Sequence, residues 1–167
     1  NNGNGCQLST IEYDGFGRTW KSHDPEQDAY KFTEYDYFAD DTTQSVTDAR
    51  GAVTSFSYNQ NKMITQISYV TSGSIPATTV PNTFQYDAVG NRIQMNDEKG
   101  QSNYSYDVLS QVTSESRYFN ALGATFSRDY SYNAAGLLTA ISDPGDPNNL
   151  LGASYSYDKV GRLMTVG

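Results

Sequence analysis

Cysteine and histidine are almost missing from this chain of 167 residues, which holds one of each, Cys6 and His23. A single cysteine cannot form an internal disulfide, and neither residue lies in a local catalytic motif. A structural zinc site needs roughly four ligands, and no glycine-rich phosphate loop precedes a helical segment. We therefore expect no catalytic residue, no metal and no cofactor, and we expect that the protein is not an enzyme.

Positive charge and long apolar runs are also scarce. Lysine and arginine number 11 against 19 acidic residues, for a net charge of −8, which argues against nucleic acid as a partner. No stretch approaches the ~18 apolar residues of a membrane span, and no basic segment followed by an apolar one opens the chain as in a signal peptide. We expect no membrane span and a flexible leader over residues 1–10. The chain is expected to be cut from a longer protein or secreted by another route.

The acidic residues are scattered along the chain. The richest clusters are Asp24–Asp28, Asp40-Asp41 and the pair Asp143 and Asp146. Loops of this kind can supply the roughly six oxygens that calcium takes, but none has the spacing of an EF-hand. The sequence favours solvated turn residues that keep the protein soluble and leaves calcium binding open.

Aliphatic side chains are too few for an ordinary globular core, since hydrophobic residues make up 37% of the chain and the mean hydropathy is −0.64. The apolar content is aromatic instead, with 14 tyrosines and 7 phenylalanines. Tyrosine joins a large apolar ring to a polar hydroxyl, so a core of tyrosines can lie close to solvent. This composition favours a thin sheet over a globule.

Tyrosine followed by aspartate or asparagine recurs at spacings of 20 to 28 residues. The residue two positions before the tyrosine is usually aromatic and the residue between is polar, as in Phe84-Gln85-Tyr86. This alternation predicts a β-strand with one aromatic and one polar face. The repeat-signature residues are Tyr13, Asp14, Gly17, Tyr35, Asp36, Tyr58, Asn59, Tyr86, Asp87, Gly90, Tyr106, Asp107, Tyr132, Asn133, Gly136, Tyr157, Asp158 and Gly161.

A turn is predicted directly after each of these strands. Aspartate or asparagine followed three residues later by glycine is typical of a type I turn whose last position takes a positive φ. Glycine is missing from the copies at Tyr35 and Tyr58, where Ala39 and Lys62 stand instead. The same spacing occurs about halfway between the tyrosines, at Asp48–Gly51, Asp97–Gly100 and Asn120–Gly123, with a variant at Asp143-Pro144-Gly145. Each repeat is therefore predicted as strand, turn, strand, turn, with a protruding loop over 71–82 and no convincing helix.

Three copies of the signature are the most complete: Tyr13–Arg18, Tyr86–Ile93 and Tyr157–Leu163. They resemble the Rhs/YD-repeat family, which includes bacterial Rhs polymorphic toxins, the B and C subunits of insecticidal toxin complexes, wall-associated proteins and teneurins. The resemblance extends over about residues 11–166. It implies an all-β fold of tandem antiparallel hairpins, in residues 11–167, forming a curved or spiralling sheet that is part of a shell-like barrel.

The resemblance implies a structural role, as a segment of an Rhs-type shell that encapsulates or displays a toxin or another polypeptide. The expected partners are neighbouring YD repeats and an enclosed toxin domain, and the expected location is secreted or cell-surface. One alternative is an extracellular adhesion module that binds carbohydrate or protein, with Trp20 as the best residue for stacking on a glycan. Another is an open β-filament, because a slice of sheet exposes edges near Ile11 and Val166 that recruit further strands.

Overall fold

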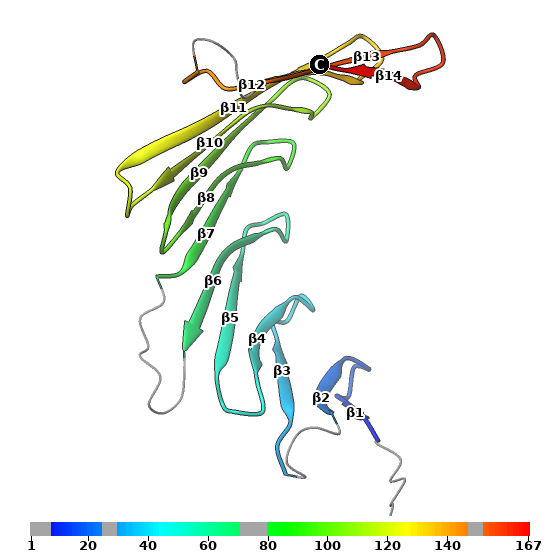
Figure 1. The fold of residues 1–167 in the computed structure, drawn as a ribbon. Helices are drawn as coiled ribbons and strands as arrows, with labels where there is room; N and C mark the ends of the chain where they lie inside the picture. Colours follow the sequence, from blue (N-terminus) through cyan, green and yellow to red (C-terminus); the bar gives the residue numbers. More distant parts are fainter. Residues whose placement is uncertain (1–7, 25–29, 71–79, 147–151) are drawn as a thin grey trace, which may run out of the picture. The chain divides into compact units, whose positions relative to one another are not determined.

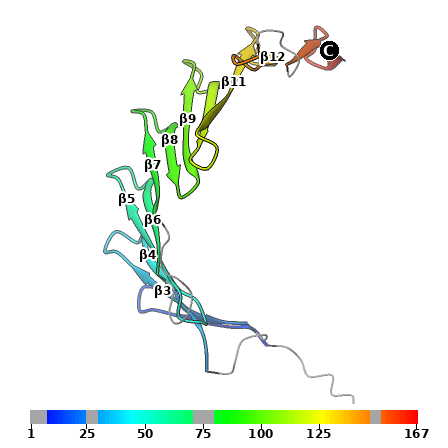
Figure 2. The same ribbon diagram turned by 60° about the vertical axis from the view of Figure 1, so that its left-hand side comes forward.

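The computed structural model describes residues 8–24, 30–70, 80–146 and 152–167, and it contains fourteen β-strands. The described residues include no helix. The chain divides into two compact units, residues 1–82 and 83–167. Within each unit the strands pair antiparallel with their neighbours along the chain, which confirms the predicted all-β hairpin fold (Figures 1 and 2).

The first unit is an antiparallel meander of six strands. Its strands are β1 (Thr10–Tyr13), β2 (Thr19–His23), β3 (Thr33–Tyr37), β4 (Thr43–Thr47), β5 (Val53–Tyr58) and β6 (Ile64–Val70). The second unit continues the same pattern from β7, whose first residue, Asn82, lies at the boundary. Its strands are β7 (Asn82–Tyr86), β8 (Arg92–Asp97), β9 (Gly100–Tyr106), β10 (Val112–Phe119), β11 (Ala124–Tyr132), β12 (Leu138–Ser142), β13 (Ala153–Tyr157) and β14 (Leu163–Val166).

Each unit is a single layer of sheet, and no second layer packs on it among the residues that the structure describes. Among the described residues no hydrophobic side chain is buried, and Ser102, at 7% exposure, is the sole buried polar residue. The predicted alternation holds along the strands: Phe84, Tyr104 and Tyr130 are half-buried, whereas Gln85 and Ser105 are exposed. Stability therefore comes from contacts between side chains on one sheet face and from the strand ladders, as in a repeat array.

Seven hairpins are closed by one type of turn, which we call the tyrosine turn. The residue after the last tyrosine of the strand donates its N–H to the carbonyl four residues later, and the residue three later donates back to its carbonyl, at N···O distances of 2.8–3.2 Å. A β-bulge adjoins each of these turns: Tyr86 pairs with Arg92 and Gln85 with Gln94, for example, which leaves one extra residue on the strand that follows the turn. The turns follow Tyr13, Tyr37, Tyr58, Tyr86, Tyr106, Tyr132 and Tyr157.

The last position of every tyrosine turn has a positive φ, as the spacing predicts. Four turns place glycine there, with φ of 76–99° at Gly17, Gly90, Gly136 and Gly161. The other three hold Asp41, Lys62 and Ser110 at φ of 59–69°, and these are the non-glycine residues with positive φ in the described part of the chain. The turn geometry therefore persists where the residue type least favours it, at some cost in free energy.

The second copy of the signature is shifted by two residues from its predicted place. The sequence assigned it to Tyr35 and Asp36, but the turn begins at Phe38 and Tyr37 pairs with Thr43. Tyr35 occupies the aromatic position two residues before the repeat tyrosine, so the aromatic-x-tyrosine motif is complete here too. The prediction was wrong because the dipeptide Tyr35-Asp36 matches the signature by itself, while Phe38 replaces the usual aspartate.

The turns that connect one hairpin to the next, here called connecting turns, are less uniform. Asp48–Gly51 forms the predicted turn, and Asp143 accepts from the N–H of Asp146 at 3.0 Å. Asp97–Gly100 also turns at the predicted place: the two residues face each other as the last pair of the ladder and leave a two-residue loop, and Asp97 Oδ1 accepts the N–H groups of Lys99 and Gly100 at 2.8 and 3.0 Å. The turn at Asn120 differs from the prediction, because Phe119, not Asn120, accepts the N–H of Gly123 at 2.9 Å. A Cβ on Gly100 would lie 1.9 Å from the carbonyl oxygen of Tyr118, so a side chain would not fit there.

Several predictions concern residues outside the described ranges. These are most of the leader over 1–10, Cys6 with it, much of the loop over 71–82, and part of the acidic cluster Asp24–Asp28. Within the described ranges, Thr10 already belongs to β1 and Asn82 begins β7.

Candidate functional site

The repeat tyrosines join each hairpin to the one before it. Five of them donate a hydrogen bond from the phenolic hydroxyl to a backbone carbonyl of the preceding hairpin, at O···O distances of 2.8–2.9 Å. We call this contact a tyrosine junction. The donor and acceptor pairs are Tyr37 and Thr19, Tyr58 and Thr43, Tyr106 and Arg92, Tyr132 and Val112, and Tyr157 and Leu138.

The tyrosine junctions share one register. Each acceptor carbonyl belongs to the residue that pairs with the preceding repeat tyrosine across its own turn, as Val112 pairs with Tyr106 and accepts from Tyr132. In every case the residue three before the donor tyrosine pairs with the residue two after the acceptor, as Asp129 pairs with Ser114. The other four pairs at these positions are Glu34 with Lys21, Ser55 with Ser45, Asn103 with Gln94, and Ser154 with Ala140. A single geometry is therefore repeated down the array.

Partial burial raises the pKa of two junction tyrosines, Tyr58 and Tyr106, above the ordinary value of 10.0. Burial raises the pKa of Tyr130 to about 12, and its 2.6 Å hydrogen bond to Glu115 Oε1 adds to the shift. All three phenols are protonated at neutral pH and able to donate.

The residue that opens the tyrosine turn is a cap for the turn itself. In six of the seven turns its side-chain Oδ1 accepts the N–H groups two and four residues later, at 2.8–3.0 Å. Asn59 and Asn133 do this as well as the aspartates, so the turn needs an oxygen acceptor rather than a charge. In the exception, which opens with Phe38, Asp40 Oδ1 accepts from the N–H of Thr42 at 3.1 Å.

These hydrogen bonds lower the pKa of several capping carboxyls. At Asp87 and Asp14, desolvation is the largest effect and raises the pKa, but the hydrogen bonds together outweigh it, chiefly those from Asn91 at Asp87 and from Arg18 at Asp14. At Asp158 the backbone N–H of Arg162 is the largest cause and the Arg162 side chain the second. Hydrogen bonds within the turn occupy these carboxylates, and their lowered pKa values do not suit proton transfer near neutral pH.

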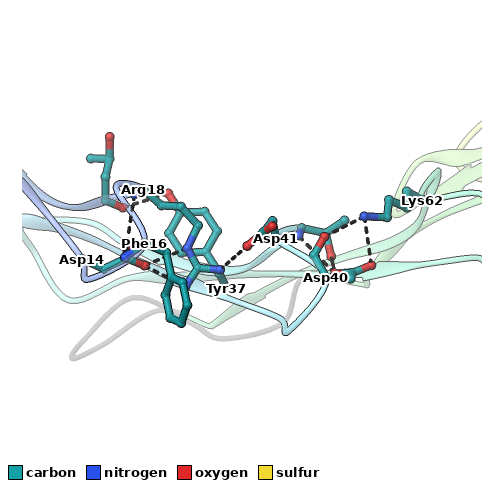
Figure 3. A network of polar contacts seen from close by, with 9 residues as sticks. Asp14, Phe16, Arg18, Tyr37, Asp40, Asp41 and Lys62 are labelled. Atoms are coloured by element: carbon teal, nitrogen blue, oxygen red, sulfur yellow. Dashed lines mark hydrogen bonds and ion pairs between the residues drawn. The ribbon is translucent and has the colours of Figure 1, made fainter.

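The first two tyrosine turns are tied together by Arg18 (Figure 3). Its guanidinium contacts Asp14 Oδ2 and Asp41 Oδ1, each at 2.7 Å, and lies 5.0 Å from the ring centroid of Phe16 and 4.5 Å from that of Tyr37. The side-chain hydrogen bond that Arg18 donates to Asp14 is the largest cause of the raised pKa of Arg18. One guanidinium thus connects two carboxylates and two aromatic rings from adjacent hairpins.

Lys62 repeats this connection one hairpin further along. Its Nζ donates to the backbone carbonyl of Asp40 at 2.6 Å and lies 3.7 Å from Asp40 Oδ2 (Figure 3). In the second unit, Arg117 makes a comparable bond across strands, to both carboxylate oxygens of Asp97 at 2.7 and 2.9 Å. Charged groups in this sheet therefore bind neighbouring strands and turns to one another.

A family model described as the teneurin YD-shell matches residues 40–166. The chain belongs to this family. The match covers more than half of the sequence and confirms the resemblance to Rhs and YD repeats. A search of curated proteins gives no match for the YD-shell chain.

Two solved structures share the fold of this YD-shell chain. One is titled "Crystal Structure of TcdB2-TccC3-TEV", with a TM-score of 0.73, 18% identity, and coverage of 91% of this chain and 9% of that one. The other is titled "Crystal Structure of TcdB2-TccC3-Cdc42", with a TM-score of 0.62, 16% identity, and coverage of 92% and 10%. The YD-shell chain therefore spans about a tenth of the length of these structural neighbours.

Trp20, the predicted glycan-stacking residue of the YD-shell chain, lies on β2 and is 44% exposed. The ammonium of Lys21 lies 4.4 Å from its ring centroid and is bonded to Glu34 at 2.7 Å. His23 packs at 5.6 Å against the ring of Phe32. Trp20 and His23 therefore both contact neighbouring side chains, and the Nε2 of His23 is buried without a hydrogen-bond partner among the described residues.

The described ranges hold no cluster of three or more metal-ligating side chains and no helix that could cross a membrane. A hollow of about 360 Å³ lies on the second unit and is lined by Tyr104, Glu115, Arg117, Phe126 and Arg128, among others. Two of its polar groups are already bound, Glu115 by Tyr130 and Arg117 by Asp97.

Sequence reasoning missed the carbonyl acceptors of the tyrosine junctions, since backbone carbonyls carry no sequence signal. It also missed Tyr37, for which the later turn residue Asp41 was the available clue, as aspartate tolerates positive φ.

Proposed function

We propose that this chain forms part of the wall of a YD shell, and that it acts as a scaffold around or beside another polypeptide rather than as an enzyme. The observation that carries the proposal is the tyrosine junction. It is repeated five times at 2.8–2.9 Å in one register, and each time it joins a hairpin to its neighbour through a tyrosine hydroxyl and a backbone carbonyl. A wall needs such a repeated, sequence-tolerant joint between its elements.

The polar side chains support the same interpretation. Turn carboxylates cap their own turns, and Arg18 and Lys62 tie adjacent turns together (Figure 3). An active site normally keeps some titratable groups directed at open space, with pKa values tuned for proton transfer. Here structural hydrogen bonds lower the pKa of the capping aspartates, at Asp14 and Asp87 against the opposing effect of desolvation, so these pKa values move away from neutrality.

The family and the structural neighbours suggest what the wall surrounds. The titles of both neighbours join a third name, TEV or Cdc42, to TcdB2 and TccC3, and the chain covers only about a tenth of their length. We infer that it is one segment of a longer, secreted or surface-located protein whose complete shell encloses or displays a polypeptide such as a toxin.

Limited proteolysis of the full-length polypeptide that contains this segment tests the proposal. A shell predicts that the enclosed polypeptide resists protease, and that weakening the wall with Tyr58→Ala and Tyr132→Ala removes the resistance. Tyr118→Ala, at a 40% exposed position in the same sheet, is the matched control and should leave it intact. Equal cleavage of the candidate cargo in all three proteins would contradict enclosure.

A glycan array of the isolated chain separates the wall from an adhesion module. A wall segment gives no reproducible glycan signal. A signal that is lost on Trp20→Ala would instead favour the adhesion module, with the exposed face of Trp20 as its stacking surface.

A further inference from the structure

The tyrosine junctions hold hairpins together but do not distinguish one hairpin from another. All five use the same donor, a phenolic hydroxyl, the same acceptor, a backbone carbonyl, and the same register. A hairpin that lay beside the wrong neighbour could therefore form the same bond. Because strands of similar sequence slip or pair wrongly unless a further contact specifies their partner, such an array needs a contact that differs from one boundary to the next.

Consecutive tyrosine turns of one unit contact each other at fixed positions. The residue that opens a turn is position 1, the residue with positive φ is position 4, and the residue after it is position 5. At four of the five boundaries between consecutive tyrosine turns inside the two units, position 5 of one turn contacts position 4 of the next. The four pairs are Arg18 with Asp41, Asn91 with Ser110, Gln111 with Gly136, and Leu137 with Gly161.

The first two pairs join one side chain to another. Arg18 Nη1 lies 2.7 Å from Asp41 Oδ1, so this pair is ionic. Asn91 Nδ2 donates to Ser110 Oγ at 3.1 Å, and both of these groups are neutral. In both turns position 5 also bonds the aspartate at position 1 of its own turn, at 2.7 and 2.9 Å, which orients the side chain that reaches the next turn.

The other two pairs have glycine at position 4. Gln111 Nε2 donates to the backbone carbonyl of Gly136 at 2.8 Å. A Cβ on Gly161 would lie 3.6 Å from Leu137 Cδ1, so the leucine packs directly over the glycine. Glutamine and leucine at position 5 are thus each matched to a residue without a side chain.

The fifth boundary uses position 4 as well, with a different partner in the preceding turn. Lys62 Nζ donates to the backbone carbonyl of Asp40 at 2.6 Å and lies 3.7 Å from its Oδ2. Thr42, at position 5 of that preceding turn, donates its hydroxyl to Asp40 Oδ1 at 2.6 Å within its own turn. Position 4 therefore meets the preceding turn at every boundary inside the two units.

The strained residues of the tyrosine turns all serve this contact. Asp41, Lys62 and Ser110 are the non-glycine residues with positive φ in the described ranges, and the side chain of each bonds the preceding turn. Glycine would remove the cost of the left-handed backbone but would also remove the side chain. Backbone strain that persists in this way indicates a function for the side chain, which here is the contact with the preceding turn.

The pairs are not interchangeable. If the hairpin that carries Lys62 followed the turn of Arg18, two cations would face each other. If the hairpin that carries Asp41 followed the turn of Leu137, its carboxylate would find no donor at position 5. Repulsive and unpaired groups of this kind are a common way to discriminate against a wrong partner.

We propose that positions 5 and 4 of consecutive tyrosine turns form a recognition pair, which selects the neighbouring hairpin, while the tyrosine junction supplies the bond common to all hairpins. Each turn fits a hairpin whose position 4 complements its own position 5: a carboxylate for arginine, a hydroxyl for asparagine, and glycine for glutamine or leucine. At the remaining boundary, the lysine at position 4 fits an aspartate at position 3. The proposal does not depend on whether the sheet encloses a polypeptide.

Exchange of one recognition pair for another tests the proposal by urea denaturation of the whole chain. Asp41→Lys places beside Arg18 the position-4 residue of the following turn, and it should raise the equilibrium constant for unfolding by about 5- to 10-fold. Asp41→Ser removes the ion pair alone and should raise it by about 2- to 5-fold.

The same Asp41→Ser substitution is then made in an Arg18→Asn background, which reproduces the pair of Asn91 and Ser110. There it should raise the equilibrium constant for unfolding about 3-fold less than it does beside arginine, since the cost of a left-handed serine is the same in both backgrounds and cancels. Asp36→Lys is the charge-matched control, because the bond of Asp36 to Ser45 stays within its own hairpin. It should change the constant by about 2-fold or less.

A disulfide at the boundary between β2 and β3 reports how the two hairpins align. The described ladder there consists of two residue pairs, one of which is Ser22 with Thr33. In a Cys6→Ser background, Ser22→Cys with Thr33→Cys should form a disulfide readily, because directly opposed residues lie at a suitable distance. Adding Asp41→Lys should slow its formation several-fold, whereas adding Asp36→Lys should not.

Two results would overturn the proposal. The first is an equal cost of Asp41→Ser beside Arg18 and in the Arg18→Asn background, since the two positions would then not be coupled. The second is a disulfide that forms as fast with Asp41→Lys as with Asp36→Lys, since alignment would then be independent of the pair. If Asp41→Lys does not fold, the comparison of the two Asp41→Ser variants decides the proposal alone.

Discussion

The tyrosine turns and the connecting turns, which are the two rows of turns compared here, differ in how uniform their backbone geometry is. All seven tyrosine turns share the same pair of backbone hydrogen bonds and the same bulge, although three of them lack glycine at the left-handed position. The connecting turns vary, from the five-residue pattern at Asp48 to the two-residue loop between Asp97 and Gly100. The difference follows from the tyrosine junctions, which begin at the tyrosine turns and tolerate no change in register. A connecting turn has only to reverse the direction of the chain between one hairpin and the next.

Truncation of a junction tyrosine should produce the largest difference between the rows. Tyr132→Ala removes a half-buried ring and the bond to the Val112 carbonyl, so we expect a loss of about 2–3 kcal/mol in the free energy of unfolding. Phe126→Ala, near the connecting turn and 56% exposed, should cost less than about 1.5 kcal/mol. Urea denaturation of the two variants measures both values, and equal losses would remove the distinction between the rows.

Substitution of the left-handed glycines comes next in size. Gly90 and Gly161 have φ of 99° and 82°, so Gly→Val at either position should destabilise the fold by roughly 1–2 kcal/mol. Gly15 lies in the same kind of turn, has no positive φ, and no atom would meet a Cβ there within 4 Å. Gly15→Val is therefore the control, with an expected loss below about 0.5 kcal/mol, and a similar loss at all three sites would contradict the conformational explanation.

The reverse substitution sharpens the comparison. Ser110 occupies the left-handed position of its tyrosine turn at φ 62°. Ser110→Gly should relieve the strain and raise the free energy of unfolding by about 0.5–1 kcal/mol, slightly offset by loss of the 3.1 Å contact from Asn91. Thermal denaturation with an unchanged or lower midpoint would show that the strain at Ser110 is negligible.

Sequence patterns predicted most of the fold because the repeat is local. The signature is confined to one strand end and the turn that follows it, and it consists of aromatic-x-tyrosine, the capping residue and usually glycine three residues later. This short pattern located six of the seven tyrosine turns. The Tyr37 turn was missed because Tyr35-Asp36 imitates the signature and only the register of β3 against β4 separates the two. The tyrosine junctions could not be predicted from local pattern, since their acceptors are backbone carbonyls 14 to 20 residues away.

The smallest expected effect is on acid stability, through the capping aspartates. The pKa of Asp87 is lowered from 3.8 in the folded state, so its contribution is complete above that value and is lost as the pH falls through the folded pKa. Asp87→Asn keeps the oxygen acceptor, as Asn59 and Asn133 do naturally, and should lose less stability between pH 4 and pH 2 than the wild type. Chemical denaturation at both pH values measures this, and an unchanged acid response would exclude Asp87 as a source.

The most direct test of the central claim, that tyrosine hydroxyls lock adjacent hairpins together, is the free energy of unfolding of single Tyr→Phe variants. Tyr132→Phe keeps the ring and removes only the hydroxyl bonded to Val112, leaving that carbonyl without its donor. Tyr118→Phe removes the hydroxyl of a 40% exposed tyrosine on β10 and serves as the control. The account predicts a loss of about 1 kcal/mol or more for Tyr132→Phe and less than about 0.3 kcal/mol for Tyr118→Phe. Equal values for the two variants would contradict it.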